Sequence, residues 1–119
     1  MTTLLVDNFA PRLRLWSKHL IRQGLSVVTA GSGEDAYLTL NSQKFDAMVL
    51  NMGLPDGEAL SISDFAIFRN PEIRIIAVTS DRFFSDGTLF NYIPNLRTHV
   101  ADTVQIEDLT AAIYHYAHN

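Results

Sequence analysis

The sequence contains no cysteine, and this absence excludes several kinds of site. Without cysteine there is no disulfide framework, no thiolate nucleophile and no thiolate metal centre. Charged residues make up only 18% of the 119 residues, the net charge is −4, and no polybasic tail is present. We therefore expect no direct nucleic-acid contact by this domain.

Long hydrophobic runs are also missing. The first residues, MTTLLVDNFAPR, contain an apolar run of three residues with no basic residue before it, so we expect no signal peptide. No stretch approaches the roughly 20 apolar residues that a membrane-spanning helix needs. With 47% hydrophobic residues, the chain suits one globular domain over residues 1–119. We expect it to be cytoplasmic, with no membrane contact.

Short apolar runs alternate with helical patterns along the chain. The predicted strands are Leu4–Asp7, Ser26–Ala30, Ala47–Leu50, Ile73–Val78 and a shorter His99–Ala101. The predicted helices run from Pro11 to Gly24, from the N-cap Ser32, over 58–69 and over Ile106–His115. Strands separated by helices predict an α/β fold, a doubly wound parallel sheet with helices on both faces.

Two of the helical segments carry more detailed expectations. In 58–69 we expect Leu60, Phe65 and Phe68 to face inward. Segment 81–98 should hold a fourth helix, but Gly87 and Pro94 bracket only a short candidate. We therefore expect that helix to be short or irregular.

Polar residues follow the predicted strands at the points where ligands bind in doubly wound sheets. Asp7 and Asn8 follow the first strand, Asn51 the third, Thr79 the fourth and Asp102 the fifth. If the first, third and fourth strands are neighbours, the first four of these side chains share one crevice.

Other patterns in the sequence favour ordinary structural explanations. Gly31–Ala36 matches a dinucleotide-binding glycine pattern, but Glu34 and Asp35 would repel a pyrophosphate there, so a capped helix start is the better interpretation. The histidines show no metal-binding spacing beyond the pair His115 and His118 near the chain end. We expect no metal site and no cofactor.

The motifs LLVDN, VVTAGSGEDA, FDAMVLNMGLPDGEAL and IIAVTS, in this order, resemble the receiver domain of bacterial two-component response regulators. The resemblance covers essentially the whole chain. It implies a flavodoxin-like sheet of five strands with five helices. It also implies phosphoryl transfer to an aspartate after the third strand, with magnesium held by that aspartate and an acid pair. A threonine or serine and a lysine would bind the acyl phosphate.

The sequence departs from this pattern at three positions. The acceptor position holds Asn51, and an amide is a poor nucleophile. The acid pair is reduced to Asp7 and Asn8, and Gly53 offers only a backbone carbonyl, which makes a weak cage for magnesium. We expect Asn8 and Asn51 to donate hydrogen bonds to Asp7 in place of a metal.

The end of the predicted fifth strand is the third departure. The lysine that the resemblance implies should fall at Ala101 or Asp102, and no lysine follows Lys44 anywhere. Only Thr79 is retained from the implied phosphate site. These losses predict an atypical, phosphorylation-independent receiver that is not an enzyme. It would act through protein–protein contacts in bacterial signal transduction or transcription control.

Two alternatives stay open at this stage. One is a conventional phosphorylatable receiver that uses another acceptor, such as Asp7 or Asp56, and the other is a small-molecule-sensing domain at the same crevice. A partner or a second copy would bind a contact face on the last third of the chain. A DNA-binding output domain in a longer parent chain also remains open. The contact-face candidates are Phe83, Phe84, Phe90, Tyr92 and Tyr114.

Overall fold

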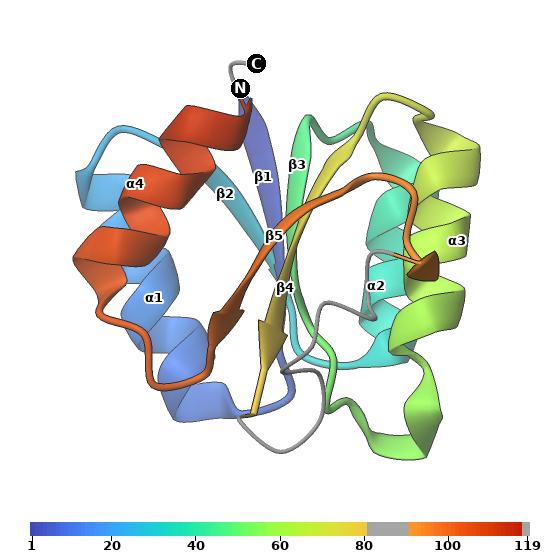
Figure 1. Ribbon diagram of the computed structural model, residues 1–119, viewed down its shortest axis with the longest axis horizontal. Helices are drawn as coiled ribbons and strands as arrows, with labels where there is room; N and C mark the ends of the chain where they lie inside the picture. The colour runs from blue at the N-terminus through green and yellow to red at the C-terminus, as the bar shows by residue number, and fades with distance from the viewer. Residues whose placement is uncertain (81–90, 118–119) are drawn as a thin grey trace.

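The computed structural model describes residues 1–80 and 91–117, without the side chains of Asp56 and Ala117. Its strands form one parallel sheet in the order β2-β1-β3-β4-β5 (Figure 1). Strand bounds are β1 Thr2–Val6, β2 Ser26–Ala30, β3 Ala47–Asn51, β4 Arg74–Thr79 and β5 Leu96–Ala101. β1 and β3 are therefore adjacent, and the ends of the strands meet at one edge, as the sequence predicts.

Helices cover both faces of this sheet. Helix bounds within the described residues are α1 Ala10–Arg22, α2 Gly33–Ser42, α3 Ala59–Arg69 and α4 Ile106–Ala117, with a short 3₁₀ turn at Pro55–Gly57. In Figure 1, α1 and α4 lie on one side of the sheet, and α2 and α3 lie on the other. This arrangement confirms the predicted flavodoxin-like, doubly wound fold.

The strands read as continuous apolar runs because both of their faces are buried. Leu4 and Val6 of β1 pack into the core beneath α2 and α3, whereas Leu5 packs into the core beneath α1 and α4. Local signals set the helix ends. Gly24 ends α1 with a φ of 93°, and the Ser32 hydroxyl caps α2 by accepting from the Asp35 N–H at 3.1 Å.

The prediction for the inward face of α3 was wrong for Leu60 and Phe68, whereas Phe65 does pack against the core. Its buried residues are Ala59, Ile62, Ser63 and Ala66, whereas Leu60 is 39% exposed and Phe68 is 76% exposed. Spacings of three and four keep the buried set on one side of the helix. On that side, Ala59, Ile62 and Ala66 join the core that the sheet shares with α2 and α3. Phe65 is half-buried and packs edge-on against Tyr37 of α2, with 5.4 Å between ring centroids.

Two differences concern the segment that precedes α4. β5 begins at Leu96 rather than His99, because its N-terminal half continues the pairing with β4 past a register shift beside Ile75. The predicted short fourth helix falls mainly on 81–90, outside the described residues, and 91–95 form turns. Ile93 and Leu96 are buried in the α2–α3 core, so this segment covers the sheet there.

Candidate functional site

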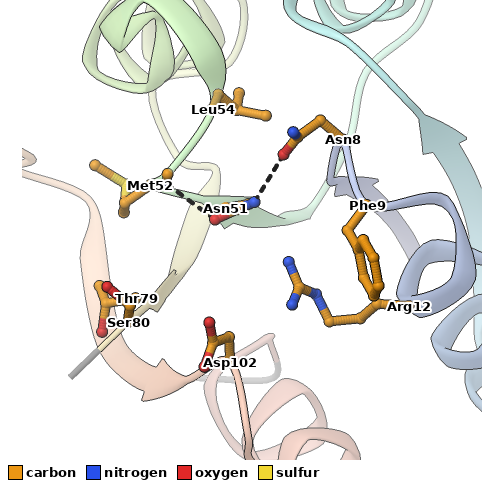
Figure 2. A pocket seen from close by; sticks show the side chains of 10 residues that line it. Asn8, Phe9, Arg12, Asn51, Met52, Leu54, Thr79, Ser80 and Asp102 are labelled. Atoms are coloured by element: carbon orange, nitrogen blue, oxygen red, sulfur yellow. Dashed lines mark hydrogen bonds between the residues drawn. The ribbon is translucent and has the colours of Figure 1, made fainter. Parts of the chain in front are cut away.

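The carboxyl ends of β1, β3, β4 and β5 surround a cavity of about 650 Å³ (Figure 2). It brings together Asn8, Asn51, Gly53, Thr79 and Asp102, which the sequence places at strand ends, and Asp7 lies buried against Asn51. Phe9, Met52 and Leu54 add an apolar part. The full lining is Asn8, Phe9, Arg12, Asn51, Met52, Gly53, Leu54, Thr79, Ser80 and Asp102.

Asn51 links the ends of two strands through its side-chain amide. Its Nδ2 donates to Asp7 Oδ1 at 3.2 Å and to Asn8 Oδ1 at 3.0 Å. Its Oδ1 accepts the Gly53 N–H at 2.9 Å (Figure 2). Asn51 thus donates to Asp7 as predicted, but Asn8 accepts from Asn51 and does not donate to Asp7. The Asn51 Nδ2 group donates to both Asp7 and Asn8, so the Asn8 side chain acts as an acceptor.

Arg12 supplies the strongest partner of Asp7. From α1, its Nε donates to Asp7 Oδ2 at 2.5 Å and its Nη2 donates to Asp7 Oδ1 at 3.0 Å. The Phe9 N–H also donates to Asp7 Oδ1, at 2.9 Å. The guanidinium carbon lies 5.3 Å from the Phe9 ring centroid and 5.6 Å from that of Trp16. Two-point hydrogen bonding and two aromatic rings hold the group in one orientation.

Burial makes this ion pair more than a surface contact. The Asp7 side chain is 2% exposed and that of Arg12 is 18% exposed. The hydrogen bond to Asp7 raises the pKa of Arg12, and the negative charges of Asp7 and Asp102 act in the same direction, while burial opposes them. Arg12 is therefore a permanent cation in the pocket.

Sequence reasoning missed Arg12, although the sequence carries a signal for it. Arg12 lies in the first turn of α1, and no acidic residue accompanies it there. The N-terminal end of a helix is the positive end of its dipole, so a cation there is unfavourable unless an anion lies nearby. Asp7 stands just before that helix and provides the anion. A basic residue in the first turn of a helix that follows a strand ending in aspartate is therefore the pattern that predicts the ion pair between Arg12 and Asp7.

The opposite wall of the cavity is formed by Thr79 and Asp102. The Thr79 hydroxyl donates to the Val100 carbonyl at 3.5 Å, and the Asp102 N–H donates to the Thr79 carbonyl at 2.9 Å. β5 ends at Ala101, and the residue that follows it into the cavity is the acid Asp102, so neither position at which the resemblance implies a lysine holds one. Among the described residues of this wall, none is a cation that could bind a phosphoryl group.

These residues do not fit a magnesium ion. Asp7 already accepts from Phe9, Asn51 and twice from Arg12, so both of its oxygens are engaged. Asn51 directs its N–H₂ toward Asp7, and its oxygen is held by Gly53. Magnesium takes oxygen ligands in octahedral geometry, usually one or two carboxylates together with waters, and here a guanidinium stands at the only carboxylate of the β1 end.

The glycine pattern at Gly31–Ala36 does not form an open anion site. A Cβ placed on Gly33 would lie 1.8 Å from the Glu58 Oε2, so a carboxylate already lies against the first residue of α2. Anions favour a helix N-terminus that is free of other negative groups. This geometry supports the interpretation of a capped helix start.

The candidate contact face is only partly described. Tyr92 is 59% exposed. Tyr114 is half-buried among residues of the α1–α4 core, and its hydroxyl donates to the Gln23 carbonyl after α1. Phe83, Phe84 and Phe90 lie outside the described residues. Among the helices described, none has the length and apolar character needed to cross a bilayer.

Comparison with known proteins gives similarity at the level of structure only. No protein-family model matches the chain, and no curated protein sequence matches it. The CheY-like response regulator receiver domain from Methanospirillum hungatei superposes with a TM-score of 0.87 at 20% identity, over 98% of this chain and 93% of that one. A protein named as an adenylate cyclase from Rhodopirellula baltica gives 0.87 at 20% identity, over 98% and 87%.

The receiver domain of a sensor histidine kinase from Pseudomonas aeruginosa is similar as well. It superposes with a TM-score of 0.82 at 18% identity, over 99% of this chain and 98% of that one, and its structure holds magnesium in the active-site cleft. Because these identities are low, the comparisons define the fold. The chain has the CheY-like receiver fold.

Proposed function

We propose that this chain is a phosphorylation-independent receiver-type module that regulates through protein–protein contacts in bacterial signal transduction. The observation that carries the proposal is the hydrogen-bonding direction of Asn51. Its amide donates to Asp7 and Asn8, and its oxygen is occupied by the Gly53 N–H. A group that donates at this position cannot attack phosphorus, since attack requires a free, electron-rich oxygen.

The surroundings of Asn51 support the same conclusion. Transfer of a phosphoryl group needs cations that neutralise its charge as the bond breaks. The only described cation of the pocket, Arg12, is paired with Asp7, and Asp102 lines the wall beyond Thr79. A phosphoryl group on Asn51 or Asp7 would lie beside these carboxylates, and no described residue of the pocket would offer it a free positive group.

A module of this kind has no catalytic step of its own, so its output is a contact with another protein. We propose that the last third of the chain supplies the contact surface for a partner or a second copy, with Phe83, Phe84, Phe90, Tyr92 and Tyr114 as the candidate residues. Exposed aromatic groups are enriched at such surfaces, and Tyr92 is one. We place the protein in the cytoplasm, where the kinases and regulators of this signalling class act on receivers.

The chemical part of the proposal is tested by incubating the chain with acetyl phosphate and magnesium and measuring its intact mass. No phosphoryl group should be added. A gain of one phosphoryl group that hydroxylamine removes would contradict the proposal. Repeating the incubation with Asp7→Asn and Asp56→Asn would then identify the acceptor, because loss of the added mass in one variant names its site.

The contact part is tested by light scattering on the wild type and on Phe84→Ser/Phe90→Ser. A dimer that the double substitution dissociates, while the far-UV circular dichroism is retained, supports self-association through this face. A dimer that both substitutions leave intact would contradict the proposed face. A monomer at high micromolar concentration would exclude self-association and leave a different protein as the partner.

A further inference from the structure

Arg12 occupies the place at the strand ends where the carboxylates of the pocket need a positive charge. It reaches from α1 into the space between Asn51 and Asp102 (Figure 2). Its contacts with Asp7 involve both carboxylate oxygens, at 2.5 and 3.0 Å. A guanidinium is planar and matches a carboxylate in this two-point manner, whereas an ammonium would not.

We propose that Arg12 is a built-in cation that replaces a bound divalent ion and keeps such ions out of the pocket. The inference rests on the proposed function, since it explains how the charge of Asp7 is balanced without a metal ion. The exclusion of divalent ions then depends on one side chain of α1. Because that cation is part of the chain, the charge of the pocket does not vary with the ions in solution.

Three observations make Arg12 a fixed group of the pocket rather than a mobile surface cation. Its side chain is 18% exposed, its partner Asp7 is 2% exposed, and the rings of Phe9 and Trp16 lie 5.3 and 5.6 Å from its guanidinium carbon. Helix α1 follows β1 after a short turn in which the Phe9 N–H is bound by Asp7. Backbone and side chain therefore direct Arg12 onto the same carboxylate.

Asn51 and Arg12 are complementary in this account. The amide brings no charge, so one cation balances Asp7, and the other acid among the described lining residues is Asp102 at the far wall. With an aspartate at position 51, two carboxylates would face each other and would attract a divalent ion. Arg12 would compete with that ion for Asp7. The competition can be measured by changing both residues.

The experiment titrates Mn²⁺ into Asn51→Asp, with and without Arg12→Gln, and follows the fluorescence of Trp16. Trp16 is the single tryptophan of the chain and lies beside Arg12, so a paramagnetic ion at Asp7 should quench it. We expect N51D/R12Q to bind Mn²⁺ at least tenfold more tightly than N51D. N51D/R14Q is the matched control, because Arg14 is an exposed residue of the same helix. It should bind like N51D.

Equal Mn²⁺ affinity of N51D and N51D/R12Q would overturn the inference, and so would the absence of binding in both folded variants. Should N51D/R12Q fail to fold, the wild type gives the answer. The Arg12 Nε–H resonance in ¹⁵N-labelled protein should not change at 10-fold excess Mn²⁺ or at millimolar Mg²⁺. A selective change in that resonance on adding Mg²⁺ would mean that the ion displaces Arg12.

Failure of this inference differs from failure of the proposed function. If wild-type protein gains a phosphoryl group from acetyl phosphate, the proposed function is wrong whatever the Mn²⁺ affinities are. If acetyl phosphate leaves the wild type unmodified while N51D and N51D/R12Q bind Mn²⁺ with equal affinity, only the role assigned to Arg12 is wrong.

Discussion

Asp7 and Arg12 form a two-point ion pair that joins the end of β1 to the first turn of α1, with N–O distances of 2.5 and 3.0 Å. The same carboxylate accepts from Asn51 at the end of β3. Three elements of the fold thus meet at one buried anion. Its removal should therefore affect both the stability of the fold and the charge of the pocket.

Asp7→Asn should lower the free energy of unfolding by about 2 kcal/mol. Breaking a fully buried ion pair costs about 3–5 kcal/mol, and the partly exposed guanidinium of Arg12 recovers some hydration, which reduces the effect. Urea unfolding of both proteins measures the difference. Asp64→Asn, at an exposed position of α3, is the control and should change stability by less than about 0.5 kcal/mol. Equal stabilities of wild type and Asp7→Asn would show that the pair contributes nothing.

The effect of Asp7→Asn should be the same at pH 7 and pH 10. Asp7 raises the pKa of Arg12 in the folded state. A raised pKa contributes stability that is fully present below the unfolded-state value and is lost only as the pH passes through the higher folded-state value. Both values lie above pH 10, since free arginine titrates above about 12. Urea unfolding at the two pH values tests this, and a contribution that fades by pH 10 would contradict the assignment of the cation to Arg12.

Asn51→Asp should destabilise the protein by about 1–2 kcal/mol and should not restore phosphorylation. The substitution removes the donor to Asp7 and Asn8 and places a second carboxylate where the amide nitrogen lies 3.2 Å from Asp7 Oδ1. Asn8→Asp adds the same charge at an exposed residue that acts as an acceptor, so it should cost less. Thermal unfolding and intact mass after acetyl phosphate measure the two properties. Recovery of phosphorylation by Asn51→Asp alone would show that the other losses matter less than proposed.

The two sides of α3 should respond differently to substitution. Ile62→Ala should cost about 2–5 kcal/mol, because Ile62 is fully buried and its loss leaves a cavity. Phe68→Ser should change stability by less than about 0.5 kcal/mol, because Phe68 is 76% exposed. Denaturant unfolding of the two variants compares them directly. A larger loss for Phe68→Ser would mean that α3 presents the other side to the sheet.

The sequence predicted the sheet well because its strands are short apolar runs separated by clear helix signals. Strand ends in a parallel sheet meet at one edge, so Asp7 and Asn51 could be placed together without coordinates. The inward side of α3 was predicted wrongly because the large residues Leu60 and Phe68 were weighted above the smaller Ala59 and Ala66. The spacing of the residues decides which side of a helix is buried, and here it puts Ala59 and Ala66 on the buried side.

Arg12 was missed for a different reason. Its contact with Asp7 spans five positions and depends on the turn between β1 and α1, which no periodic pattern describes. Its side-chain orientation also depends on Phe9 and Trp16. The unfavourable position of a cation at a helix N-terminus was the available signal. Asn8 was predicted wrongly as a donor to Asp7, because the sequence does not show that the Asn51 Nδ2 group lies within reach of both Asp7 and Asn8.

The most direct test of the account is the response of ¹⁵N-labelled wild-type protein to magnesium and beryllium fluoride, which together mimic a phosphoryl group on an acceptor aspartate. The account predicts that the backbone amide resonances of Gly53, Thr79 and Asp102 keep their positions, because Asn51 offers no carboxylate and Arg12 holds Asp7. Saturable shifts of these resonances would show that the pocket still accepts a metal and a phosphoryl group, and would contradict a phosphorylation-independent receiver.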